Sequence, residues 1–227
     1  IVMKKKTSFL KLLMMVIKFL IPFTVILLKI IHPQVKYGWL FVGYVIFVAV
    51  ERTFETFYSG RFEKHISRLE KDWTFQAVAL VYTTMAFIMM FEFFLVPRTF
   101  TPFLVIYGGT IYLIALFLRL WGVKTLGESW QTKILTRQLI TDKGPYKYMR
   151  HPIYFGVILE ALSVSMIAGT FYAFLFAIFI FASLMILKTY LEEKDLIKIY
   201  GDKYREYTQK CWAYLPLPKG RFFKKAS

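Results

Sequence analysis

The sequence is poor in the residues that build disulfides, metal centres and common soluble active sites. It contains one cysteine, Cys211, among 227 residues, which excludes an intrachain disulfide and a thiolate metal cluster. Its three histidines (His32, His65 and His151) lie far apart, without the spacing of metal ligands, so we predict no metal site. It has no glycine-rich loop between a strand and a helix, as nucleotide binding would need, and no Ser–His–Asp signature.

Apolar and aromatic residues are abundant instead. They make up 57% and 19% of the chain, and they gather in runs near or above the length that spans a membrane. The fold class that we predict is an all-α, polytopic integral membrane protein. The net charge of +16 does not indicate nucleic-acid binding, because the basic residues flank the apolar runs as they do in the cytosolic loops of membrane proteins. The partners that we expect are membrane lipids.

The apolar runs predict five or six transmembrane helices. Residues 4–31 are interrupted by lysines on one helical face, so they either span the membrane or lie in its interface, and we expect no cleavable signal peptide there. The further expected spans are residues 37–58, 73–96 and 103–122, and two helices within residues 152–190 that turn at Gly169-Thr170.

The positive-inside rule gives the expected sidedness. An N-terminus in the cytosol also places the loops at 59–72 and 123–150 and the C-terminal tail there, and these segments carry most of the loop lysines and arginines. Glu92 and Arg119 are charges within predicted spans, and we interpret them as an ion pair. Three tail tyrosines recur at helical spacing, which favours packing against the membrane surface: Tyr200, Tyr204 and Tyr207.

The segment GPYKYMRHPIYFG, residues 144–156, concentrates polar and ionisable side chains at the mouth of a predicted span. Such groups are costly beside lipid and indicate a functional site. Pro152 suits the first turn of a helix, so His151 is expected at the N-cap, where the helix terminus favours an anion. The alternative is that His151 is only a cap and Tyr154 an interfacial aromatic.

A second polar cluster, Glu192-Glu193, follows the last apolar run. It is explained either as the hydrated end of a helix or as a site for a cationic group. Lys188 and Glu192 are four residues apart and would share one helical face. Our hypothesis is that this cluster and residues 144–156 meet in space.

These two motifs resemble the isoprenylcysteine carboxyl methyltransferase family, to which phospholipid methyltransferases are more distantly related. The likeness rests on an Arg-His-Pro-x-Tyr-x-Gly element at Arg150–Gly156, followed by Glu-Glu-x-x-Leu and Gly-x-x-Tyr-x-x-Tyr at 192–207. It covers roughly residues 120–218. The resemblance implies a catalytic region at 120–227, with residues 1–119 as an anchor and lipid-access bundle.

The resemblance further implies a cytosolic pocket for S-adenosylmethionine in the C-terminal half. The implied cofactor-binding residues are Gln131, Gln138, Leu139, Ile140, Tyr146, His151, Pro152, Ile153, Tyr154 and Glu192. The candidate catalytic residues are Arg150, Glu193 and Lys188. Lys188 stands where some family members have an arginine that meets the substrate carboxylate, and it keeps the charge without the bidentate fork.

The expected function is methyl transfer to a lipidic acceptor that enters from the bilayer. The acceptor is a prenylcysteine carboxylate or another lipid head group, such as a phenol, an enol or an amine, and the host is a bacterial inner membrane or the endoplasmic reticulum. Two alternatives stay open: an NADPH-dependent lipid or sterol reductase, since such enzymes show a similar His-Pro-x-Tyr-x-Gly segment, and a non-catalytic basic membrane scaffold.

Overall fold

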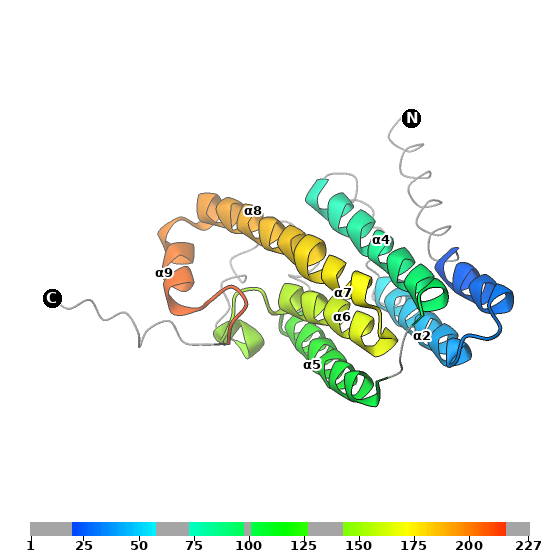
Figure 1. Ribbon diagram of the computed structural model, residues 1–227. Helices are drawn as coiled ribbons and strands as arrows, with labels where there is room; N and C mark the ends of the chain where they lie inside the picture. The colour runs from blue at the N-terminus through cyan, green and yellow to red at the C-terminus, as the bar shows by residue number, and fades with distance from the viewer. Residues whose placement is uncertain (1–19, 58–72, 98–100, 127–142, 217–227) are drawn as a thin grey trace. The chain divides into compact units, whose positions relative to one another are not determined.

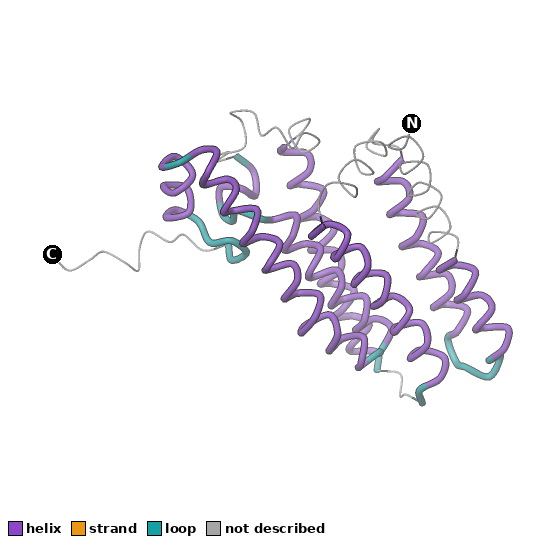
Figure 2. The backbone as a smooth tube through the Cα atoms, turned by 90° about the horizontal axis from the view of Figure 1, so that it is seen from above, coloured by secondary structure: helices purple, strands orange, loops and turns teal. Residues whose placement is uncertain are grey.

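Every regular element that the structure describes is a helix. The computed structural model describes residues 20–57, 73–97, 101–126 and 143–216 (Figure 1; Figure 2). The helices are Leu20–Ile31, α2 (Gly38–Phe57), α4 (Trp73–Leu95), α5 (Pro102–Leu126), η2 (Gly144–Lys147), α6 (Pro152–Ala168), α7 (Phe171–Phe176), η3 (Ala177–Phe181), α8 (Ala182–Tyr200) and α9 (Asp202–Lys210). The all-α prediction is confirmed for these residues.

Three of the described helices are long and apolar enough to cross a membrane, which is the character of an integral membrane protein. They are Trp73–Leu95, Pro102–Leu126 and Phe171–Tyr200. Three shorter apolar helices accompany them, Leu20–Ile31, Gly38–Val50 and Pro152–Ala168. Because a span needs about 20 apolar residues, length and composition support three spans, and the expected five or six are not established.

The long apolar stretch after His151 divides where the sequence predicts. Helix α6 ends at Ala168 and the next helix begins at Phe171, with Gly169 between them at φ 65°. Glycine adopts this left-handed conformation without the steric penalty of a Cβ. The second helix is longer than expected. It contains the π-helical turn η3 and continues to Tyr200, so Glu192 and Glu193 lie within it rather than at its end.

The chain forms two compact units. The first comprises residues 1–102 and 168–176. Among its described residues, Phe41 of α2 stacks on Phe93 of α4 with ring centroids 3.7 Å apart and meets Phe94 edge-on. Lys29 is buried and its ammonium donates to the carbonyls of Pro33 and Val35, which holds the turn before α2.

Glu92 of α4 binds the beginning of α7 in the same unit. Its carboxylate oxygens accept the backbone N–H groups of Tyr172 at 3.0 Å and Ala173 at 2.9 Å. Helix N-termini have unpaired N–H donors and a positive partial charge, so a buried carboxylate is compensated there. The predicted pairing of Glu92 with Arg119 is therefore wrong.

Arg119 finds its partner in the second unit, which comprises residues 103–167 and 177–227. Its guanidinium contacts the Glu160 carboxylate of α6, and both side chains are buried. Helices α5 and α6 approach closely here because Gly156 faces Arg119: a Cβ on Gly156 would lie 2.7 Å from Arg119 Cγ and 2.9 Å from the Ala115 carbonyl. Small residues permit such close packing between membrane helices.

The tail folds back on the second unit. Gly201, at φ 56°, makes the turn between α8 and α9, where a larger residue would be strained. Tyr204 and Tyr207 then pack with Leu196 and Cys211 in a buried cluster. The prediction that these tyrosines pack against the membrane surface is wrong for Tyr204 and Tyr207, because both rings point into the protein.

Candidate active site

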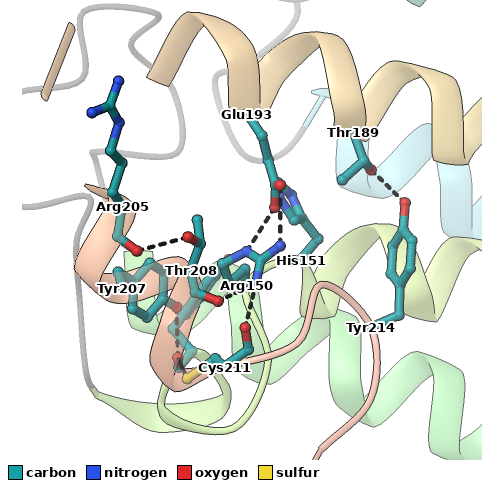
Figure 3. A network of polar contacts seen from close by, with 10 residues as sticks. Arg150, His151, Thr189, Glu193, Arg205, Tyr207, Thr208, Cys211 and Tyr214 are labelled. Atoms are coloured by element: carbon teal, nitrogen blue, oxygen red, sulfur yellow. Dashed lines mark hydrogen bonds and ion pairs between the residues drawn. The ribbon is translucent and has the colours of Figure 1, made fainter. Parts of the chain in front are cut away.

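The two polar clusters of the sequence meet, as predicted, between the beginning of α6 and helix α8. Glu193 accepts hydrogen bonds from Arg150 at both oxygens, from Nε at 2.7 Å and from Nη2 at 3.1 Å. His151 Nε2 lies 2.9 Å from the same carboxylate (Figure 3). Arg150 Nη1 also donates to the backbone carbonyls of Thr208 and Cys211. Glu193 is thus fully engaged by its neighbours.

Glu192 turns to a different partner. Its Oε2 accepts the Tyr154 hydroxyl at 2.6 Å, and its Oε1 accepts no hydrogen bond from the residues that the structure describes. Lys188, one turn earlier on α8, is buried, with its ammonium 5.9 Å from the centroid of the Tyr154 ring. The prediction that Lys188 and Glu192 share a face is confirmed, since both approach Tyr154.

The charges of this cluster stabilise one another. Burial disfavours the charged form of Arg150, but the hydrogen bond and the charge of Glu193 outweigh it and raise the pKa of the guanidinium. Burial and the nearby charge of Glu193 raise the pKa of the Tyr204 phenol, which therefore stays neutral. The cluster is a cationic Arg150 held against an anionic Glu193, with neutral phenols around it.

His151 occupies the N-cap position that its sequence context predicts. Helix α6 begins at Pro152, and the His151 carbonyl accepts the N–H of Phe155 at 3.0 Å. Its ring stacks near that of Tyr154, with centroids 5.6 Å apart and planes inclined by 11°. The side chain is nevertheless more than a cap, because it reaches Glu193 on another helix.

The other candidate residues divide into two groups. Tyr146 and Ile153 pack with Leu126 in a separate buried cluster, and the Tyr146 carbonyl accepts the Tyr207 hydroxyl at 2.6 Å. Pro152 is buried at the beginning of α6. Four candidates lie outside the described residues: Gln131, Gln138, Leu139 and Ile140. The structure therefore brings together Arg150, His151, Tyr154, Lys188, Glu192 and Glu193.

Sequence reasoning missed the contribution of the C-terminal loop. The backbone N–H groups of Arg150 and His151 donate to the carbonyls of Trp212 and Ala213, both at 2.9 Å. Every residue has a backbone carbonyl, so the amino-acid sequence contains no residue type from which this contact could be predicted. Tyr214 contacts Thr189 of α8 through its hydroxyl, and a polar aromatic in a tail rich in tyrosine is equally inconspicuous.

Comparison with known protein families gives one match that includes residues of the candidate active site. The isoprenylcysteine carboxyl methyltransferase (ICMT) family matches residues 108–198, which contain Arg150, His151 and both glutamates. This part of the chain is therefore similar to the ICMT family. The matched residues cover α6 and most of α5 and α8, so they include the paired glutamates and the residues at the beginning of α6 that contact them. No solved structure matches the chain significantly.

Several curated relatives carry methyltransferase names. A methanethiol S-methyltransferase of Pseudomonas sp. (strain GM41(2012)) is 33% identical over 114 residues, which are 48% of this chain and 42% of that protein. A protein-S-isoprenylcysteine O-methyltransferase of Schizosaccharomyces pombe is 29% identical over 106 residues, 44% of each chain. Methanethiol S-methyltransferase 1 of Bradyrhizobium diazoefficiens is 38% identical over 73 residues, covering 31% of this chain and 24% of that protein. The chain spans less than half of the length of each of these relatives.

Proposed function

We propose that this protein is a membrane methyltransferase that uses S-adenosylmethionine and methylates a lipidic or membrane-associated acceptor. The observation that carries the proposal is the contact of Arg150, His151 and Tyr154 with the paired glutamates of α8. The ICMT match over the same residues supports it, as do the methyltransferase names of the relatives.

The residues present fit a methyl donor of this kind. S-adenosylmethionine carries a sulfonium, an ammonium, a carboxylate and an adenine, and when bound it supplies an electrophilic methyl carbon. Glu192 has one oxygen that accepts no hydrogen bond from the described residues, so it suits the ammonium or the sulfonium. The N-terminus of α6 beside His151 suits the carboxylate, and the Tyr154 ring offers a face for stacking.

The two glutamates then have different roles. Glu193 accepts two N–H groups of Arg150 and contacts His151, so we assign it to holding these side chains against α8. A carboxylate already bonded in this way is poorly placed to take a proton from an acceptor. Glu192 is the member of the pair that binds a ligand. Fixed side chains of this kind contribute to rate by aligning the reactants.

The acceptor is proposed as an anionic oxygen or sulfur nucleophile with an apolar body. The names of the relatives include both O- and S-methyl transfer. Lys188 is the buried cation near Tyr154 and suits a carboxylate or thiolate, which it holds as a point charge. An acceptor of this class needs no base at the moment of transfer. Its apolar body would reach the site from the bilayer.

The test is incubation of membranes that contain the protein with methyl-labelled S-adenosylmethionine, followed by identification of the labelled product. We expect Glu192→Gln to weaken donor binding at least tenfold, because it removes the charge proposed to face the ammonium or sulfonium. We expect a similar loss for His151→Ala, because it removes the ring that contacts Glu193 and stacks near Tyr154. Asp195→Asn is the matched control, because Asp195 is an exposed carboxylate on the same helix. Undiminished binding in both site variants contradicts the assignment. Tight binding of NADPH with none of S-adenosylmethionine favours a reductase instead.

A further inference from the structure

The C-terminal loop is part of the site although it lies beyond the residues that match the ICMT family, which end at 198. Met149 pairs with Trp212 in a short parallel bridge, and the next two N–H groups, of Arg150 and His151, donate to this loop. Cys211 Sγ lies 3.1 Å from the Lys147 carbonyl. The loop thereby fixes the backbone from which the Arg150 and His151 side chains extend.

Tyr214 connects this loop to helix α8. Its hydroxyl donates to the Met185 carbonyl at 3.2 Å. The same hydroxyl is hydrogen-bonded to the Thr189 hydroxyl (Figure 3). A phenol has one proton, so when it is given to Met185 the Thr189 hydroxyl is the donor in the second bond. Thr189 is buried on the face of α8 one turn before Glu193. The loop is thus attached to the helix that carries both glutamates.

The ring of Tyr214 also supports the beginning of α6. Its centroid lies 6.3 Å from that of His151, with planes inclined by 53°, and 6.2 Å from that of Phe155. Burial, together with the charges of Glu193 and Glu192, raises the pKa of the Tyr214 phenol to about 12, although the Thr189 hydrogen bond lowers it. The phenol therefore keeps its proton, and the contact with Met185, throughout the neutral range.

We propose that Tyr214 is a positioning residue that holds the His151 ring and the beginning of α6 at a fixed place against α8. Its hydroxyl anchors the ring to Met185 and Thr189, and the anchored ring limits the movement of His151, which contacts Glu193. The part of this inference that concerns ligand binding rests on the proposed function. The part that concerns the placement of His151 does not.

The test uses the whole protein in detergent and two readouts. The substitutions are Tyr214→Phe, which removes only the hydroxyl, and Thr189→Val, which removes its partner. The first readout is the ring resonances of histidine in a labelled sample, with His151 assigned by its loss in His151→Ala. The second is the Kd for S-adenosylmethionine. We expect both variants to shift the His151 resonances and to raise the Kd about tenfold, with the melting temperature nearly unchanged.

The matched control is Tyr190→Phe, since Tyr190 is an exposed tyrosine adjacent to Thr189. It should move neither readout. If the wild-type protein binds the donor and Tyr214→Phe changes neither the His151 resonances nor the Kd, the positioning role is refuted. If the resonances shift but the wild-type protein binds no donor, the positioning role is supported and the proposed function is refuted.

Discussion

Two arginine–glutamate pairs join helices within the described part of the second unit, and their surroundings differ. Arg119 and Glu160 lie between α5 and α6 with side chains only 4% and 1% exposed. Arg150 and Glu193 lie between the beginning of α6 and α8 with side chains 8% and 18% exposed. The second pair also contacts His151 and the carbonyls of the tail, and it stands beside Glu192.

We interpret the first pair as serving the fold and, on the proposed function, the second pair as serving a site. Arg119 is buried and packs closely against Gly156 of α6. The charges there compensate each other, and a buried pair of this kind adds specificity of packing more than stability. Around Glu193 the partially exposed side chains can meet a ligand, and Glu192 is oriented next to them.

The largest effect is expected from breaking the first pair. Glu160→Gln leaves the Arg119 charge buried without its counter-charge, which costs about 3–5 kcal/mol of the free energy of unfolding. Thermal unfolding in detergent should show a large fall in the melting temperature. Methyl-donor binding, measured below the melting temperature, should be retained, because Glu160 pairs with Arg119 between α5 and α6.

The control replaces both members of the pair. Arg119→Met combined with Glu160→Leu removes both buried charges and fills their place with apolar side chains. This double variant should therefore recover most of the stability lost in Glu160→Gln. A double variant that is no more stable than the single one would show that the loss does not come from an uncompensated charge.

Breaking the second pair, Arg150 and Glu193, is expected to reduce stability less and donor binding more than breaking the first pair. Glu193→Gln keeps the shape of the side chain but removes the charge that Arg150 and His151 face. The free energy of unfolding should fall by about 1–3 kcal/mol. Donor binding should fall at least tenfold, because both side chains lose the group that orients them. Glu206→Gln, the same change at an exposed position of α9, is the control. The comparison of the two pairs fails if Glu193→Gln unfolds the protein as severely as Glu160→Gln.

Much of the helical framework could be predicted, because membrane helices are defined by run length and by proline and glycine. The spans expected at 73–96 and 103–122 agree closely with α4 and α5, and the turn at Gly169 is where it was predicted. The meeting of residues 144–156 with Glu192-Glu193 was also predicted. The signal there was that polar groups beside lipid need partners, although each cluster taken alone also had a purely structural explanation.

Partner choice was harder to predict than position. Glu92 and Arg119 were both recognised as costly charges, but each had more than one possible partner, and a helix N-terminus leaves no signal that pairs it with a distant carboxylate. Glu160 was overlooked within a nearly apolar run, although an isolated charge there is itself a signal. The end of α8 was predicted too early because the polar residues after Lys188 suggested that the helix ends where it leaves the membrane. The helix continues as far as Tyr200.

The smallest effect is expected from Tyr154→Phe, which separates the two glutamates by role. The substitution removes the hydroxyl that Glu192 accepts at 2.6 Å and keeps the ring that faces Lys188. Because Glu192 is only half-buried, water can replace the lost hydrogen bond, and the stability should fall by about 1 kcal/mol or less. The Kd for S-adenosylmethionine should rise by about three- to tenfold, less than in Glu192→Gln. Equal losses in the two variants would show that the hydroxyl, rather than the carboxylate, determines binding. No change in Tyr154→Phe would show that Glu192 is held in place by α8 alone.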